Sequence, residues 1–175
     1  MTGTYHLVTL GCPKNQVDSD KLAGTLVADG MRATKDADEA DLIVVNTCAF
    51  IDEARRESID TVLALVDERR DGARLVVTGC MAERYGDELA EALPEVDRVA
   101  GFGVPVTLGY KPAPRDEPAS TSTFDLLNLP RPAAERPWAY VKVAEGCDRA
   151  CGFCAIPTFR GPQRSRTMDD LLAEV

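Results

Sequence analysis

Three short apolar runs in the first half of the chain each end in a cysteine: LVTLGC at residues 7–12, IVVNTC at 43–48 and LVVTGC at 75–80. Apolar runs of this length are typical of strands buried on both faces. The stretches between them have apolar residues at helical spacing, so strands and helices alternate along residues 1–103. This alternation predicts an α/β fold in which a parallel sheet has helices on both faces.

The same patterns give approximate boundaries for the elements. The apolar runs predict strands at residues 5–10, 31–34, 42–45, 75–77 and 96–100. Helical spacing predicts helices over residues 17–28, 52–70 and 82–93. We expect Asn15 or a neighbour to cap the first helix and Gly30 to close it, while Pro94 ends the third.

The positions of the three cysteines predict a binding site. Ligands of an open parallel sheet gather at the carboxyl ends of its strands. Cys12, Cys48 and Cys80 each follow such an end, so we expect their thiols at one rim of the sheet. Three thiolates can hold three irons of a [4Fe–4S] cluster and leave the fourth iron open. The alternative is that these cysteines are small core residues.

The second half of the chain differs in composition. Residues 110–137 hold six of the eleven prolines and show no sustained periodicity, so they predict a linker. The alternating Ala139, Val141 and Val143 predict a strand, and a helix is expected from Thr167. One strand–loop–helix unit cannot bury its own core. We therefore expect a first domain over 1–109, a linker over 110–137, and over 138–175 the start of a domain that continues further.

Cys147, Cys151 and Cys154 form a CxxxCxxC motif directly after this expected strand. Such a loop can bind one iron–sulfur cluster and again leave one iron without a protein ligand. A structural zinc site normally requires four donors, so zinc with a remote fourth cysteine remains an alternative. A disulfide would leave an odd thiol. The sequence lacks a signal-peptide pattern or a membrane-spanning apolar run, and we expect a cytoplasmic protein with reduced thiols.

Charge and histidine content narrow the function classes. The net charge is −9, and residues 1–110 account for all of it, so this acidic part is a poor partner for nucleic acid. His6 is the sole histidine, which excludes a catalytic triad. The stretch FRGPQRSR at residues 159–166 has three arginines and no acid. Arginine can hold carboxylates or phosphates, but a solvated basic loop is the favoured interpretation.

The CxxxCxxC motif, with Phe153 before its last cysteine, resembles the cluster loop of radical S-adenosylmethionine enzymes. The resemblance implies that the open iron binds S-adenosylmethionine and that Phe153 packs near the adenine. It implies that cleavage of this cofactor gives a 5′-deoxyadenosyl radical, which removes hydrogen from a carbon. It also implies that residues 138–175 are the first strand–loop–helix unit of a partial TIM barrel.

Together with three scattered cysteines upstream, the motif resembles the radical methylthiotransferases. LGCPKNQVDSD (10–20), NTCAFIDEARRESID (46–60) and GCDRACGFCAIPTFRGPQRSR (146–166) are most similar to the RimO branch. That resemblance implies an auxiliary [4Fe–4S] cluster on Cys12, Cys48 and Cys80, and hence two clusters in total. It implies methylthiolation of the β-carbon of an aspartate in the twelfth protein of the small ribosomal subunit, free or in the assembled subunit. A one-electron donor such as flavodoxin or ferredoxin is implied as well.

Two other functions stay open from the sequence. A tRNA methylthiotransferase of the MiaB type would use the same clusters, but it more often has Gln-Met-Asn where this chain has Pro13-Lys14-Asn15. A non-catalytic zinc or redox-sensing module would use the CxxxCxxC motif structurally. The sequence indicates no particular oligomeric state.

Overall fold

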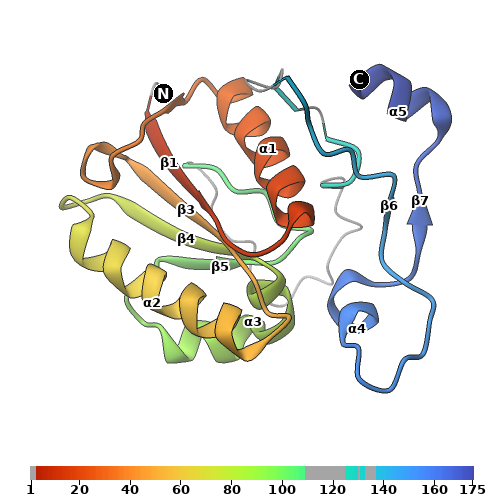
Figure 1. Cartoon of the computed structure of the whole chain (residues 1–175). Helices are drawn as coiled ribbons and strands as arrows, with labels where there is room; N and C mark the ends of the chain where they lie inside the picture. The colour runs from red at the N-terminus through yellow and green to blue at the C-terminus, as the bar shows by residue number, and fades with distance from the viewer. Residues whose placement is uncertain (1–2, 109–124, 130, 133–136) are drawn as a thin grey trace, which may run out of the picture.

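The computed structural model describes residues 3–108, 125–129, 131–132 and 137–175. Its centre is a five-stranded parallel sheet with the strand order β2-β1-β3-β4-β5 (Figure 1). The strands are β1 (Thr4–Thr9), β2 (Arg32–Ala33), β3 (Leu42–Thr47), β4 (Arg74–Gly79) and β5 (Arg98–Ala100). The predicted α/β fold with a parallel sheet is confirmed.

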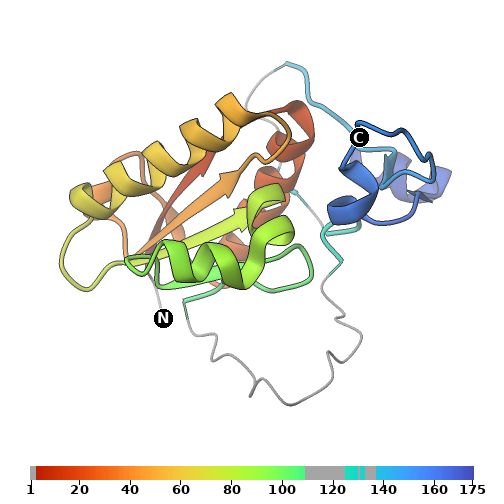
Figure 2. The ribbon, with the colours of Figure 1, turned by 90° about the horizontal axis from the view of Figure 1, so that it is seen from below.

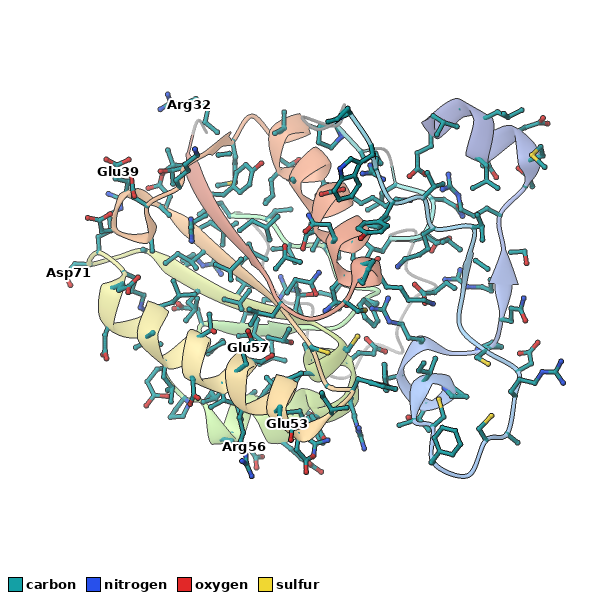
Figure 3. All side chains as sticks on the ribbon, viewed as in Figure 1. Arg32, Glu39, Glu53, Arg56, Glu57 and Asp71 are labelled. Carbon is teal, nitrogen blue, oxygen red and sulfur yellow. The ribbon has the colours of Figure 1, made fainter. Side chains whose placement is uncertain are left out.

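Helices cover both faces of this sheet (Figures 1 and 2). The three helices are α1 (Pro13–Ala28) on one face, and α2 (Asp52–Glu68) and α3 (Cys80–Ala92) on the other; a short 3-10 turn, η1 (Ala37–Glu39), precedes β3. All of β3 is buried, and its alternate residues face opposite sides. Val44 packs in the cluster under α1, whereas Val45 packs in the cluster under α2 and α3. The polar face of α2, with Glu53, Arg56 and Glu57, points to solvent (Figure 3).

Two helix starts differ from the prediction. The first helix begins at Pro13 instead of residue 17, because proline suits the first helical turn and its absent N–H is not needed there. Asn15, the expected cap, is therefore buried inside that turn, and Cys12 is the N-cap. The third helix begins at Cys80, directly after Gly79, whose φ of 93° turns the chain. Two of the three strand-end cysteines thus lie where a helix starts.

The C-terminal residues form a small second unit. It comprises β6 (Ala144–Glu145), α4 (Ile156–Arg160), β7 (Arg164–Ser165) and α5 (Met168–Glu174), and β6 pairs antiparallel with β7. The helix expected from Thr167 is confirmed, and the Thr167 hydroxyl caps it by accepting from the backbone N–H of Asp170 at 3.2 Å. The partial barrel implied by the resemblance stays a prediction.

The strand expected through Ala139, Val141 and Val143 is wrong, since only residues 144–145 form a strand there. Val143 is 59% exposed, while Lys142 beside it is buried. Lys142 is buried because it forms an ion pair with Asp18 of α1, so burial here does not follow the apolar alternation.

Most of the expected linker over 110–137 lies outside the described residues. In its described part, Leu126 and Leu127 are buried. Leu126 packs in the same core cluster as Leu22 and Val76, and Lys21 donates a hydrogen bond to the carbonyl of Leu127. This part of the segment therefore folds back onto the first unit.

Ion pairs attach α5 to α1. The side chain of Glu174 is 7% exposed and lies 3.5 Å from the Lys21 ammonium and 3.4 Å from the Arg131 guanidinium. Arg166 donates to the same carboxylate. Burial alone raises the pKa of Glu174, but the Arg166 hydrogen bond and the Lys21 charge outweigh it and hold the pKa below its ordinary value.

These contacts predict that the Glu174 carboxylate contributes to the free energy of unfolding and that acid removes this contribution. A carboxylate with a lowered folded pKa stabilises the protein above its unfolded pKa, and that stabilisation is lost as pH falls through the folded pKa. We expect Glu174→Gln to lower the free energy of unfolding by about 1–3 kcal/mol at neutral pH. The difference from the unsubstituted protein should shrink below about pH 4.

Urea unfolding between about pH 7 and pH 3 measures this difference. Asp169→Asn is the matched control, because Asp169 is exposed on the same helix; it should change stability by less than about 0.5 kcal/mol. A Glu174→Gln difference that stays constant with pH would contradict the assignment.

Candidate functional site

The register of the sheet brings the three strand-end cysteines together. Thr9 of β1 pairs with Asn46 of β3, and Thr47 of β3 pairs with Gly79 of β4. Continuing each strand puts residue 11 level with residue 48, and residue 48 level with residue 80. Cys12, Cys48 and Cys80 therefore lie at the carboxyl edge of three adjacent strands, where ligands of parallel sheets bind.

The three thiols differ in exposure. Cys48 and Cys80 are each 6% exposed, whereas Cys12 is exposed. Gly11 has a φ of 90°, and a Cβ at this residue would lie 2.7 Å from Cys48 Cβ and 2.9 Å from its Sγ. The backbone between β1 and α1 thus packs directly on Cys48. Cys12 borders a hollow of about 700 Å³ that is also lined by Trp138 and Tyr140.

Two buried asparagines lie beside the cysteines. Asn15 Nδ2 donates to the carbonyls of Leu10 at 2.8 Å and Thr47 at 3.0 Å, which joins the ends of β1 and β3. Asn46 Nδ2 donates to the Asn15 carbonyl at 2.9 Å. The strand order reverses between β1 and β3, and such sheets bind ligands at this reversal. The bonds therefore join the two strand ends at the expected binding crevice. Both residues therefore fix the edge that presents the thiols.

Cys80 has an arginine beside its sulfur. Arg160 Nη2 lies 3.1 Å from Cys80 Sγ and 2.8 Å from Asn15 Oδ1. Burial raises the pKa of the Cys80 thiol, and Cys48 and Cys12 raise it further, while the Arg160 guanidinium opposes the increase. A thiolate at this depth therefore needs a cation, which Arg160 or a bound metal can supply.

The second cysteine set lies in the loop between β6 and α4. Cys147, Cys151 and Cys154 all line one hollow of about 490 Å³. Two backbone hydrogen bonds fix this loop. At its start, the N–H of Cys147 donates to the carbonyl of Gly161 at 3.0 Å, and near its end, the N–H of Cys154 donates to the carbonyl of Cys151 at 3.1 Å. The Phe153 side chain, predicted to pack near an adenine, is 95% exposed.

The donor chemistry at both places fits an iron–sulfur group. All six cysteines are free thiols, and soft sulfur donors favour iron–sulfur clusters or zinc. Within the described ranges, no three His, Cys, Asp or Glu side chains are placed to hold a single metal ion. A cubane cluster takes each thiolate on a different iron, so it does not require sulfurs that converge on one ion. The ligand roles of the six cysteines stay predictions.

The structure also places charged residues here that the sequence analysis missed. Arg160 Nη1 donates to Asp18 at 2.8 Å and to Glu145 at 3.0 Å, and Lys142 contacts the same two carboxylates. Burial raises the pKa of Glu145, but the charges of Arg160 and Lys142 outweigh it and lower the pKa to about 2. Four charges from two units thus form one buried cluster next to Cys80, which we call the charge cluster.

The favoured interpretation of residues 159–166 as a solvated basic loop is wrong for two of its three arginines. The side chains of Arg160 and Arg166 are each only 4% exposed. The side chain of Arg164 is 53% exposed and is solvated as expected. Three arginines without a neighbouring acid were the available signal, because such charges must find distant partners if they are buried.

The fold and site define an α/β domain that gathers cysteines at the carboxyl edge of its sheet, with a second cysteine set in an attached loop. Residues 4–101 match the model of the uncharacterized protein family UPF0004. The chain therefore belongs to this family. Within the described ranges, no helix is both long and apolar enough to cross a membrane.

Curated relatives extend the match over nearly the whole chain. The chain is 44% identical over 178 residues to the ribosomal protein uS12 methylthiotransferase RimO of Myxococcus xanthus, covering 98% of this chain and 37% of that protein. It is 42% identical over 174 residues to the protein of the same name from Thermotoga maritima, covering 95% and 39%. The resemblance to the RimO branch is confirmed. The chain spans about two fifths of the length of these relatives.

The glycine before Cys80 gives a test of the crowded sheet edge. A Cβ at Gly79 would lie 2.6 Å from the Thr47 carbonyl oxygen and 2.7 Å from its nitrogen, whereas a Cβ at Gly72 meets nothing within 4 Å. Both glycines have φ above 80°. We expect Gly72→Ala to cost about 1–2 kcal/mol of unfolding free energy from its backbone conformation alone. Gly79→Ala should cost about 2–5 kcal/mol, since overpacking adds to it.

Urea unfolding of the two variants measures the difference. Equal losses would show that the β3–β4 edge relaxes around the added methyl group. The crowding at Gly79 would then be absent in solution.

Proposed function

We propose that this chain provides both cluster sites of a radical S-adenosylmethionine methylthiotransferase that acts on the ribosomal protein uS12. The observation that supports it is that β1, β3 and β4 end at the same level and are followed by Cys12, Cys48 and Cys80. A separate loop gathers three further cysteines around one hollow. The relatives named above as uS12 methylthiotransferases support the substrate. Because the chain spans only part of their length, the proposal concerns the whole protein.

Each cysteine set would bind one [4Fe–4S] cluster through three thiolates. Cys12, Cys48 and Cys80 would hold the auxiliary cluster, and Cys147, Cys151 and Cys154 the cluster that binds S-adenosylmethionine. When bound, S-adenosylmethionine cleaved by one electron would supply the radical that removes hydrogen from the aspartate β-carbon, and the auxiliary cluster would carry the methylthio group that replaces it. The polypeptide contributes the placement of the two sites and the burial of two of the six thiols, Cys48 and Cys80.

The exposure of the cysteines fits this division of roles. Cys48 and Cys80 are buried, so the protein covers the sheet side of the auxiliary site. Cys12 is exposed beside the hollow lined by Trp138 and Tyr140, which leaves the other side accessible to a substrate. The exposed ring of Phe153 is free to pack on the adenine of the cofactor. The proposal also includes a one-electron donor, such as flavodoxin or ferredoxin, and a cytoplasmic location.

Metal analysis tests the two sites. We expect about eight irons and about eight sulfides per chain after anaerobic reconstitution, since each cubane contains four of each. Replacing Cys12, Cys48 and Cys80 together with alanine should leave about four irons, and so should replacing Cys147, Cys151 and Cys154. Circular dichroism of each triple variant checks that it is folded.

Two results would contradict the proposal. About four irons, unaffected by loss of the first cysteine set, would show that the strand-end cysteines are core residues. Stoichiometric zinc without iron would favour the zinc module.

The substrate class is tested with the full-length protein. Reconstituted enzyme, S-adenosylmethionine and a reductant are incubated separately with uS12, with small ribosomal subunits and with tRNA. Mass spectrometry should find a methylthio group on an aspartate of uS12 and none on tRNA. Modification of an adenosine instead would establish the tRNA function.

A further inference from the structure

Arg160 links the second unit to Cys80 of the first cysteine set. It is the last residue of α4, the helix that follows the loop with Cys147, Cys151 and Cys154. Its guanidinium lies 4.3 Å from the centroid of the Phe102 ring, in a cation–π arrangement. Its Nη2 reaches Cys80 Sγ at 3.1 Å, so a residue of the second unit contacts a thiol of the first.

The surrounding residues fix this guanidinium without help from the cysteine. Nη1 donates to Asp18 and Glu145, and Nη2 donates to Asn15 Oδ1 as well as to the sulfur. Within the charge cluster, the two carboxylates balance Arg160 and Lys142. Arg160 therefore does not depend on a charged Cys80 for its position, and its Nη2 is directed at the sulfur beforehand.

We infer that Arg160 is a positioning residue of the auxiliary site, which hydrogen-bonds the Cys80 sulfur and makes the cluster bound there easier to reduce. The inference rests on the proposed function, because it needs a cluster on Cys12, Cys48 and Cys80. Hydrogen bonds to ligating sulfurs set the reduction potentials of iron–sulfur clusters. A donor stabilises the negative charge added on reduction, and a charged donor does so more strongly in a buried site.

The test uses the Cys147, Cys151 and Cys154 triple alanine variant, so that only the auxiliary cluster is present. Its potential is measured by redox titration with electron paramagnetic resonance, before and after Arg160→Lys or Arg160→Gln. Lysine keeps the charge but cannot donate to Asp18, Glu145, Asn15 and Cys80 as one planar fork. At a fixed potential, we expect both substitutions to lower the ratio of reduced to oxidised cluster about tenfold, a shift of ~59 mV for one electron.

Arg164→Gln is the matched control in the same background. Arg164 belongs to the same basic stretch, its side chain is 53% exposed, and it bonds Asp125 at 3.3 Å. Its replacement should leave the potential unchanged. A shift equal to that of the Arg160 variants would assign the effect to overall charge and overturn the inference.

A measurement without substitution at Arg160 covers the case in which its variants do not fold. Pulsed electron paramagnetic resonance of the reduced cluster, in protein labelled with ¹⁵N-arginine, should detect a nitrogen coupling from Nη2. Absence of this coupling would overturn the inference.

The outcomes separate the inference from the proposed function. If the triple alanine background binds no iron, the auxiliary site itself is wrong, and both fail. If it binds about four irons but the Arg160 variants keep the original potential, the proposed function stands and only the role of Arg160 fails.

Discussion

In-register pairing of β1, β3 and β4 is the constraint on which the site depends. Parallel strands that pair without stagger end at the same level, so a cysteine just past each end lies beside the others. A slip of one residue would move a cysteine by about 3.3 Å and turn its side chain to the opposite face. Gly11 and Gly79 support this register, because larger residues there would collide with Cys48 or with the Thr47 backbone.

A second constraint is that charges, rather than a shared apolar core alone, join the two units. Phe159 packs in the cluster under α2 and α3, as do Ala155 and Ile156. Ion pairs to Asp18 and Lys21 of α1 join the units as well. Burying charges is costly unless their geometry and hydrogen bonding are good. Ion pairs therefore fix the orientation of the docked unit more narrowly than apolar contacts would, and this orientation sets where the CxxxCxxC loop lies relative to the sheet edge.

The sequence was sufficient to predict the sheet, because strands buried on both faces must be apolar and their spacing determines the alternation with helices. It also predicted that Cys12, Cys48 and Cys80 share a rim, since βαβ connections place all carboxyl ends at one edge. It failed at residues 139–143, where the alternating apolar residues suggested a strand. Lys142 is buried there instead, and its partner Asp18 is 124 positions away.

The partners of Arg160 could not be predicted for the same reason. An arginine is buried only if acids meet it, and which acids do so depends on how two separately patterned units dock. Local sequence contains no information on that docking. The boundaries of α1 and α3 were missed by a few residues because Pro13 and Gly79 allow a helix to start immediately after the strand-end turn.

The charge cluster has a consequence for how this chain can change. Asp18 belongs to the first unit, while Lys142, Glu145 and Arg160 belong to the second, and each side carries one net charge of opposite sign. Loss of one partner leaves a buried charge uncompensated, at a cost of about 3–5 kcal/mol. Substitutions at these positions are therefore tolerated in compensating sets. A hybrid made from the halves of two relatives would dock only where the signs still match, so the four charges act as a compatibility check between the halves of one polypeptide.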